Sequence, residues 1–222
     1  MTGGPILAID TSGTRALVAL GSPEGVLIDE RRWQAGYRHG EELLTRTDEL
    51  LAATGVALAK LAGIVVGTGP GAFTGMRVGL ATAKALARGL EIPIAGVATS
   101  EALLAAIGLD AGSQAVLLLP AGPSDRVVVF AGQATLVKGG EEPVIQAGAV
   151  LVAVDLPDRA PAEALALGAN AEEGLSAALL RLGAIRIAAG GDDVARLVPE
   201  YVTLPRGIAT VKGEVRWSRD LR

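Results

Sequence analysis

The sequence predicts an α/β fold with two lobes, and three observations support this prediction. Short apolar runs rich in Val, Ile and Ala alternate with stretches of helical length and period. Half of the 222 residues are hydrophobic but only 3% are aromatic, so the core must be built from small aliphatic side chains. A glycine-rich segment at residues 67–75 joins an apolar run to a helical stretch, as at a strand-to-helix turn.

The first lobe is expected to span residues 1–99. It opens with an apolar run, a polar turn and a second apolar run, which is the pattern of a β-hairpin. The strands expected in this lobe lie at residues 6–10, 16–20, 25–33, 62–66 and 94–97.

Two helices are expected between the later strands of this lobe. The first, at residues 41–54, places Leu43 and Leu50 on one apolar face. The second, at residues 74–89, follows the glycine segment and has Thr74 available as its N-cap.

The second lobe is expected at residues 100–200, followed by a C-terminal segment at 201–222. The elements expected in the second lobe are helices at 100–108 and 175–182 and strands at 116–119, 127–131 and 133–138. We expect the C-terminal segment to pack back on the first lobe through Trp217, with a solvated basic face, in preference to contacting RNA.

Composition excludes several classes of function. The formal net charge of -4 gives no general attraction to a polyanion, so the chain alone is expected to bind tRNA poorly. The absence of cysteine removes disulfides, thiol nucleophiles and thiolate metal ligands. No signal-peptide pattern and no apolar run of membrane-spanning length are present, so we expect a cytoplasmic protein with no membrane association.

Three motifs resemble the bacterial TsaB (YeaZ) family. They are Ala8-Ile9-Asp10-Thr11-Ser12, the stretch at 38–44, and the glycine loop with its helix at 67–85. The resemblance covers residues 6–102 and is loose beyond them. It implies an actin-like ATPase (ASKHA, RNase H-like) fold with two lobes, the second divergent.

The same resemblance implies a role in making N6-threonylcarbamoyladenosine (t6A) in tRNA. The chain is then expected to be a non-catalytic dimerising subunit that binds and activates a TsaD-type transferase. That transferase moves threonylcarbamoyl from threonylcarbamoyl-AMP to the adenosine next to the anticodon. A TsaE-type ATPase is a further expected partner, the chain alone is expected to be a homodimer, and tRNA is contacted only indirectly. No cofactor is required, and weak ATP or ADP binding is expected at the interface with TsaD.

A phosphate or nucleotide site is one interpretation of the hairpin turn and the glycine loop. An acid that holds Mg²⁺ through water, together with hydroxyl and N–H donors for phosphate oxygens, is what such a site needs. The residues expected in this site are Asp10, Thr11, Ser12, Thr14, Gly69, Gly71 and Thr74. The alternative, in which the acid and hydroxyls only satisfy a turn, has equal weight.

Two features argue against catalysis. Pro120 stands where the resemblance places a second acid, and Asp125 replaces it only if the loop is reshaped. His39 is the only histidine, so the metal-binding histidine pair of TsaD-like proteins is incomplete. We therefore expect no catalytic residue and no metal site. The rival interpretations are a self-sufficient ATPase, kinase or metallopeptidase-like enzyme of this superfamily and an oxidoreductase using residues 67–72.

A turn after residues 185–187 is a weaker nucleotide signal. Those residues are expected to form a strand, and the Ala189-Gly190-Gly191-Asp192 segment after them is similar to the superfamily's adenosine-holding turn. An ordinary turn is the preferred interpretation.

A stripe of small residues on the second helix indicates a close helix contact. Gly71, Gly75, Gly79 and Ala83 recur at every fourth position, which lets another backbone approach closely. The contact is either internal or with a partner, and the family resemblance favours a partner. The residues expected at the partner interface are His39, Glu42, Leu43, Arg46, Leu50, Gly75, Met76, Gly79, Leu80 and Ala83.

Overall fold

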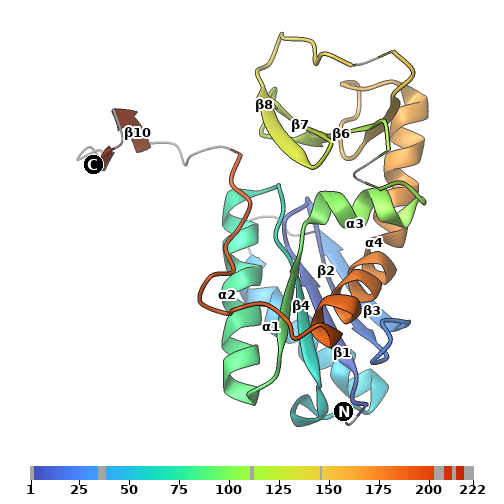
Figure 1. The fold of residues 1–222 in the computed structure, drawn as a ribbon, viewed down its shortest axis with the longest axis vertical. Coiled ribbons are helices and arrows are strands. Elements are labelled where there is room, and N and C mark those ends of the chain that lie inside the picture. Colours follow the sequence, from blue (N-terminus) through green and yellow to red (C-terminus); the bar gives the residue numbers. More distant parts are fainter. Residues whose placement is uncertain are drawn as a thin grey trace.

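The computed structural model describes residues 3–34, 39–110, 113–145, 147–202, 208–211 and 214–217, with backbone alone at 39–41 and in the last two segments. Figure 1 shows two lobes, one around a large twisted sheet that carries the N-terminus and a smaller one around a second sheet. The predicted α/β fold with two lobes is confirmed.

The first lobe is built on a five-stranded sheet in the order β3-β2-β1-β4-β5. Its strands are β1 (Ile6–Asp10), β2 (Arg15–Gly21), β3 (Leu27–Gln34), β4 (Gly63–Gly67) and β5 (Ile94–Val97). The first three strands form an antiparallel meander, and β4 and β5 add to β1 in parallel. The ends of β1 and β4 therefore reach the same edge of the sheet, which brings the hairpin turn beside the glycine loop.

Helices cover both faces of this sheet. On one face α1 (His39–Thr54) and α2 (Phe73–Leu90) pack against Leu7 and Ile9 of β1. On the other face α3 (Thr99–Ala106) and α4 (Ala162–Ala188) pack against Ile6 and Ala8. A short 3₁₀ turn, η1 (Leu58–Lys60), precedes β4. Because both faces are covered, β1 is buried along its whole length.

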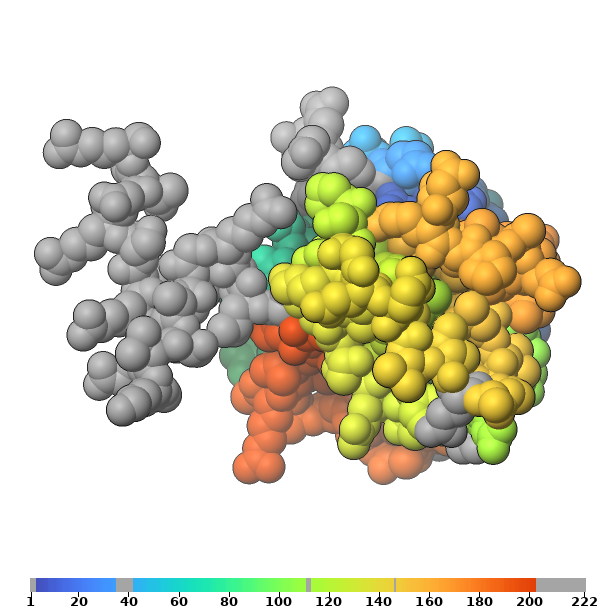
Figure 2. Space-filling model, turned by 90° about the horizontal axis from the view of Figure 1, so that it is seen from above, coloured from blue at the N-terminus to red at the C-terminus, as the bar shows by residue number. Residues whose placement is uncertain are grey.

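The second lobe repeats the strand order of the first. Its sheet runs β8-β7-β6-β9, which matches β3-β2-β1-β4 in order and in direction. The strands are β6 (Ala115–Pro120), β7 (Arg126–Phe130), β8 (Gln133–Val137) and β9 (Val150–Ala153). Pro120 thus ends β6 where Asp10 ends β1. Figure 2 shows the residues of β7 and β8, in yellow, beside the orange first half of α4.

The 27-residue helix α4 belongs to both lobes. At a rise of 1.5 Å per residue it is about 40 Å long. Near its start, Gly168 lies so close to the backbone of Ala153 that a Cβ would clash there. Near its end, Gly183 lies equally close to the side chain of Val65 in the first sheet. One rigid element therefore packs on both sheets.

Several predicted elements differ from the structure. The strand predicted at residues 185–187 is wrong, because these residues continue α4, of which the prediction found only 175–182. Strand β9 was missed. Thr74 is not the N-cap of α2, because Ala72 holds that position without a side-chain bond.

The C-terminal segment contains a hairpin of β10 (Ile208–Val211) and β11 (Glu214–Trp217). The predicted docking of Trp217 depends on side chains outside the described residues, so it stays a prediction.

Candidate functional site

A cavity of about 770 Å³ lies between the lobes. Its walls come from the β1–β2 turn at residues 12–15, the glycine loop at 70–72, the end of β6 and α4. Apolar side chains such as Leu103, Leu119 and Leu175 line much of it. Of the seven residues predicted to hold phosphate, Asp10, Ser12, Thr14 and Gly71 lie in its lining.

Asp10 is buried at the floor of this cavity and bonded on both oxygens. Its Oδ1 accepts from the Ser12 N–H at 2.8 Å and from the Ser12 hydroxyl at 2.7 Å, and its Oδ2 accepts from the Thr99 hydroxyl at 2.7 Å. Burial raises the pKa of this carboxyl above its ordinary value of 3.8, although the three hydrogen bonds oppose that change. Asp10 therefore joins the end of β1 to the start of α3.

The glycine loop also uses its hydrogen-bonding groups within the chain. The Gly69 N–H donates to the Thr99 hydroxyl at 3.1 Å, and the Ala72 N–H donates to the Ser12 carbonyl at 2.6 Å. Gly71 lies against the backbone of Ser12, so any side chain at this position would clash. The loop and the hairpin turn are thus held together by groups that a phosphate would otherwise use.

Two of the residues predicted to hold phosphate lie away from the cavity lining. Thr11 is buried beneath α2, where its hydroxyl donates to the Gly75 carbonyl at 2.6 Å. Thr74 is exposed on the first turn of α2. The cavity lining does not include Gly69 either. Burial under the helix, and not ligand binding, explains the position of Thr11.

The prediction of a partner interface at the small-residue stripe is wrong for those of its residues that are buried within the chain. A Cβ at Gly79 would clash with the Thr11 hydroxyl, so the stripe packs on the chain's own hairpin turn. A face buried in its own lobe cannot contact a partner. The seven residues to which this correction applies are Leu43, Leu50, Gly75, Met76, Gly79, Leu80 and Ala83.

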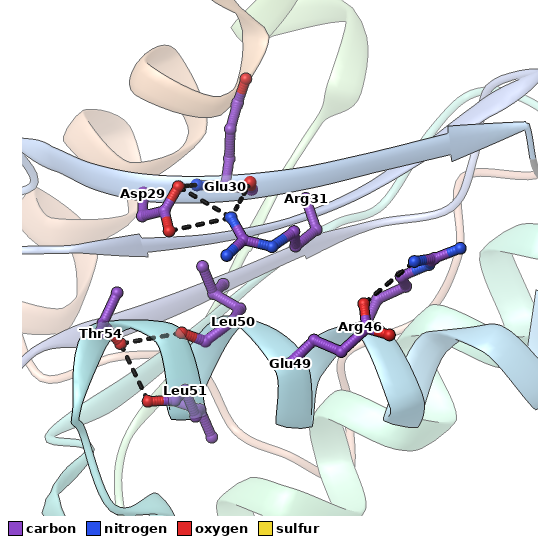
Figure 3. Close-up of polar contacts among 8 residues, drawn as sticks. All are labelled: Asp29, Glu30, Arg31, Arg46, Glu49, Leu50, Leu51 and Thr54. Atoms are coloured by element: carbon purple, nitrogen blue, oxygen red, sulfur yellow. Dashed lines mark hydrogen bonds and ion pairs between the residues drawn. The ribbon is translucent and has the colours of Figure 1, made fainter.

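The remaining residues of that interface prediction lie on α1. Arg46 is partly exposed between Glu42, at 3.9 Å, and Glu49, at 3.0 Å. Figure 3 shows Arg46 bonded to Glu49 on α1 and, above this helix, Arg31 bonded to Asp29 on β3. The His39 side chain lies outside the described residues. One arginine between two glutamates, with Asp48 also exposed, leaves the described part of α1 with a net negative charge.

The opposite wall of the cavity contributes two carboxylates that the sequence analysis missed. The Thr14 hydroxyl donates to Oδ2 of Asp155, which follows β9, and the Arg15 guanidinium bonds Oε2 of Glu172 on α4 at 3.0 Å. Burial, and then the charge of Asp155, raises the pKa of Glu172. The sequence signal that could have identified Asp155 is its position directly after the apolar run at 150–154.

The second-lobe turn does not bring Asp125 into the cavity. Its carboxylate bonds the Lys138 ammonium at 3.1 Å and the Gly139 N–H at 2.9 Å, while Pro120 lines the cavity. Asp125 therefore does not replace the second acid. Within the part of the chain that the structure describes, no three His, Asp or Glu side chains form a group able to hold a metal.

An aromatic pair stands at the cavity wall beside α2. The rings of Phe73 and Tyr201 have centroids 5.1 Å apart, and the Arg77 guanidinium lies 4.7 Å above the Phe73 ring. The backbone of Glu200 is also held in place, because its N–H donates to the Thr68 carbonyl at 2.8 Å. The segment after α4 is thus anchored on the glycine loop.

The Gly190-Gly191-Asp192 turn protects the edge of the first sheet. The Asp192 carboxylate accepts from the Gly96 N–H at 2.7 Å, and the Asp192 N–H donates to the Ile94 carbonyl at 2.7 Å. These bonds pair backbone groups at the free edge of β5. The turn therefore has a structural role and does not line the inter-lobe cavity.

Replacing Asp192 by Ala is expected to lower the free energy of unfolding by about 1–2 kcal/mol, because the Gly96 N–H loses its acceptor. Urea denaturation followed by circular dichroism measures the change. Asp193→Ala is the matched control, since Asp193 is exposed and bonds only within its own turn. Equal stability of the two variants would contradict the role assigned to Asp192.

Comparison with known proteins places this fold and cavity in a family. A family model described as TsaD: tRNA N6-adenosine threonylcarbamoyltransferase matches residues 33–180. The tRNA threonylcarbamoyladenosine biosynthesis protein TsaB of Escherichia coli is 35% identical over 94 residues, which are 42% of this chain and 40% of that protein. The TsaB protein of Bacillus subtilis is 39% identical over 100 residues, which are 45% of this chain and 43% of that protein.

The aligned part of this chain spans less than half the length of these curated relatives. Among solved structures, YeaZ from Pseudomonas aeruginosa has a TM-score of 0.61 at 23% identity, covering 89% of this chain and 99% of that one. This likeness shows that the fold is shared. No helix in the described part of the chain has the length and apolar character needed to cross a bilayer. The chain belongs to the family described by the TsaD-type threonylcarbamoyltransferase model that it matches, and the curated relatives named above, to which it is similar, are TsaB proteins.

Proposed function

We propose that this chain works in t6A formation on tRNA as a non-catalytic subunit that binds and activates a TsaD-type transferase. The proposal rests on one structural observation in a chain of this family, which is that polar groups of the inter-lobe cavity already have partners within the chain. The polar groups that a phosphate clamp would use there are bonded within the chain, from Asp10 to the Ala72 N–H. A subunit that activates an enzyme needs a stable surface and does not need an open catalytic cleft.

The outer face of α2 is the surface that we assign to the partner. The helix has three basic residues and no acidic one. Arg77 and Arg88 are exposed along this face and Lys84 is partly exposed, whereas the glycine stripe faces inward. Small exposed residues, Ala81 and Ala85, leave room between the charges for a partner side chain. A partner helix with acidic residues complements this face.

The rest of the proposal concerns the assembly. A TsaE-type ATPase joins the complex, the free chain forms a homodimer, and tRNA is held by the partner, in keeping with the net charge of -4. No cofactor is required, and any ATP or ADP binds weakly at the interface with TsaD.

The experiment reverses two charges on α2. Lys84→Glu with Arg88→Glu is expected to weaken binding to a purified TsaD-type transferase by about tenfold or more, because it places acids opposite an acidic partner face. Titration calorimetry measures the affinity, and t6A formation by the reconstituted proteins measures activation.

Arg181→Glu is the control for this pair, because Arg181 is exposed on α4, on the other face of the sheet. It should leave transferase binding unchanged. If the α2 variant binds as tightly as the unmodified chain, the partner surface lies elsewhere. Steady ATP hydrolysis by the repurified chain alone, lost in a folded Asp10→Asn variant, would instead support an enzyme.

A further inference from the structure

The hairpin turn of the first lobe presents two anion-binding groups to the inter-lobe cavity. These are the hydroxyl of Thr14 and the guanidinium of Arg15, which lie next to each other in the cavity lining. A hydroxyl beside a guanidinium is a donor set that suits phosphate oxygens. Both groups are engaged by carboxylates from the opposite wall, Asp155 and Glu172.

The described lining of the cavity contains one further arginine, Arg159. The guanidinium of Arg159 bonds the carbonyls of Gly122 and Pro123 at 3.3 and 3.2 Å. No lysine occurs among the described residues that line the cavity. An anion that enters the cavity therefore finds the two donors of the hairpin turn occupied by carboxylates, and the further arginine of that lining, Arg159, bonded to backbone carbonyls.

We propose that Asp155 and Glu172 are an internal substitute for an anionic ligand, which occupies the phosphate-binding groups of the hairpin turn and keeps phosphate compounds out of the cavity. Each carboxylate contributes one oxygen in place of a phosphate oxygen, Oδ2 of Asp155 to the Thr14 hydroxyl and Oε2 of Glu172 to the Arg15 guanidinium. The contact also ties the first lobe to α4 and to the turn after β9. Opening this contact exposes an anion site that is absent in the closed state.

The surroundings of Glu172 make its side of the contact sensitive to pH. Its side chain is 15% exposed, and the charged groups that face it are Arg15 and Arg32, which favour the carboxylate, and Asp155, which opposes it. Burial, which is the largest effect, together with the charge of Asp155 outweighs the two arginines, so the pKa of Glu172 is raised. Protonation at falling pH removes the charge that holds Arg15, so the anion site opens in acid and closes toward neutral pH.

Neutralising both carboxylates tests this inference without altering their shape. Asp155→Asn with Glu172→Gln, in the full chain at low salt and pH 7.5, is expected to bind inorganic tripolyphosphate at least about tenfold more tightly than the unmodified chain. Titration calorimetry measures this affinity, and added salt should reduce it. Melting curves establish whether the double variant is folded. If it is not, the titration is made with Glu172→Gln alone, which already frees Arg15.

Two controls decide where the anion binds. Glu173→Gln removes the same charge from the exposed neighbour on α4 and should leave the affinity unchanged. Arg15→Ala added to the double variant should abolish the gain. A folded double variant with no gain overturns the inference, and so does a gain that persists without Arg15 or appears equally in Glu173→Gln. The outcome is independent of transferase binding.

Discussion

Gly79→Leu is expected to destabilise the chain strongly, and not merely to weaken association. A Cβ at this position already clashes with the Thr11 hydroxyl, and the rest of a leucine side chain has no space between α2 and the hairpin turn. Overpacking costs about 1–3 kcal/mol, and displacing Thr11 adds the loss of its buried hydrogen bond to the Gly75 carbonyl. We therefore expect a loss of about 3 kcal/mol or more in the free energy of unfolding.

Urea denaturation followed by circular dichroism measures this loss. Ala81→Leu is the matched control, because it adds leucine to the same helix at an exposed position. It should keep near-native stability, since leucine is a good helix former. The result that would reverse our assignment is a Gly79→Leu variant of normal stability that no longer binds the transferase, which would place the stripe at a partner interface after all.

Asp10→Ala is expected to have an effect of similar size. The substitution leaves the Ser12 N–H and the Thr99 hydroxyl without their buried acceptor, while the Ser12 hydroxyl keeps the Thr99 oxygen at 3.1 Å. Each unpaired buried donor costs about 1–3 kcal/mol, so we expect a total loss of about 3 kcal/mol or more. Asp10→Asn keeps one oxygen for Ser12 and should cost much less. Equal stability of the two variants would contradict this account of Asp10.

The pH dependence of stability gives a second measure of Asp10. Because burial raises its pKa, the folded chain holds this proton at pH values where the unfolded chain, with an ordinary pKa near 3.8, has lost it. The stabilisation is complete below the unfolded pKa and is lost as pH rises through the folded pKa. Stability relative to Asp10→Asn should therefore fall with rising pH across that window. A rise would show that the folded carboxyl titrates below 3.8.

The periodic part of the fold was predictable from the sequence. Strands such as β1 and β5 were found with correct bounds, because a short apolar run between turn residues has few other interpretations. Helix α4 was mostly missed, because its exposed face carries apolar residues such as Ala166, Ala177 and Ile185. A helix with an apolar exposed face has a weak form of the amphipathic pattern that identifies a surface helix.

The site was predictable only in its local part. The position of Asp10 beside the glycine loop follows from two neighbouring parallel strands that end at the same edge. Which way the glycine stripe faces does not follow, because close packing on Thr11 and on a partner would select the same small residues. Asp155 and Glu172 were missed because they reach the hairpin turn only through tertiary structure, more than 140 residues along the chain.

Helix α4 has a consequence for how the molecule folds. The two sheets look like separate domains, yet each buries part of its apolar surface against a different half of the same helix. Neither sheet can lose its structure without removing the support of that helix from the other. The second lobe, with only four strands, depends on this shared element for its stability. The two lobes therefore unfold as one cooperative unit, and a cut between residues 99 and 100 separates the first lobe from half of its own core.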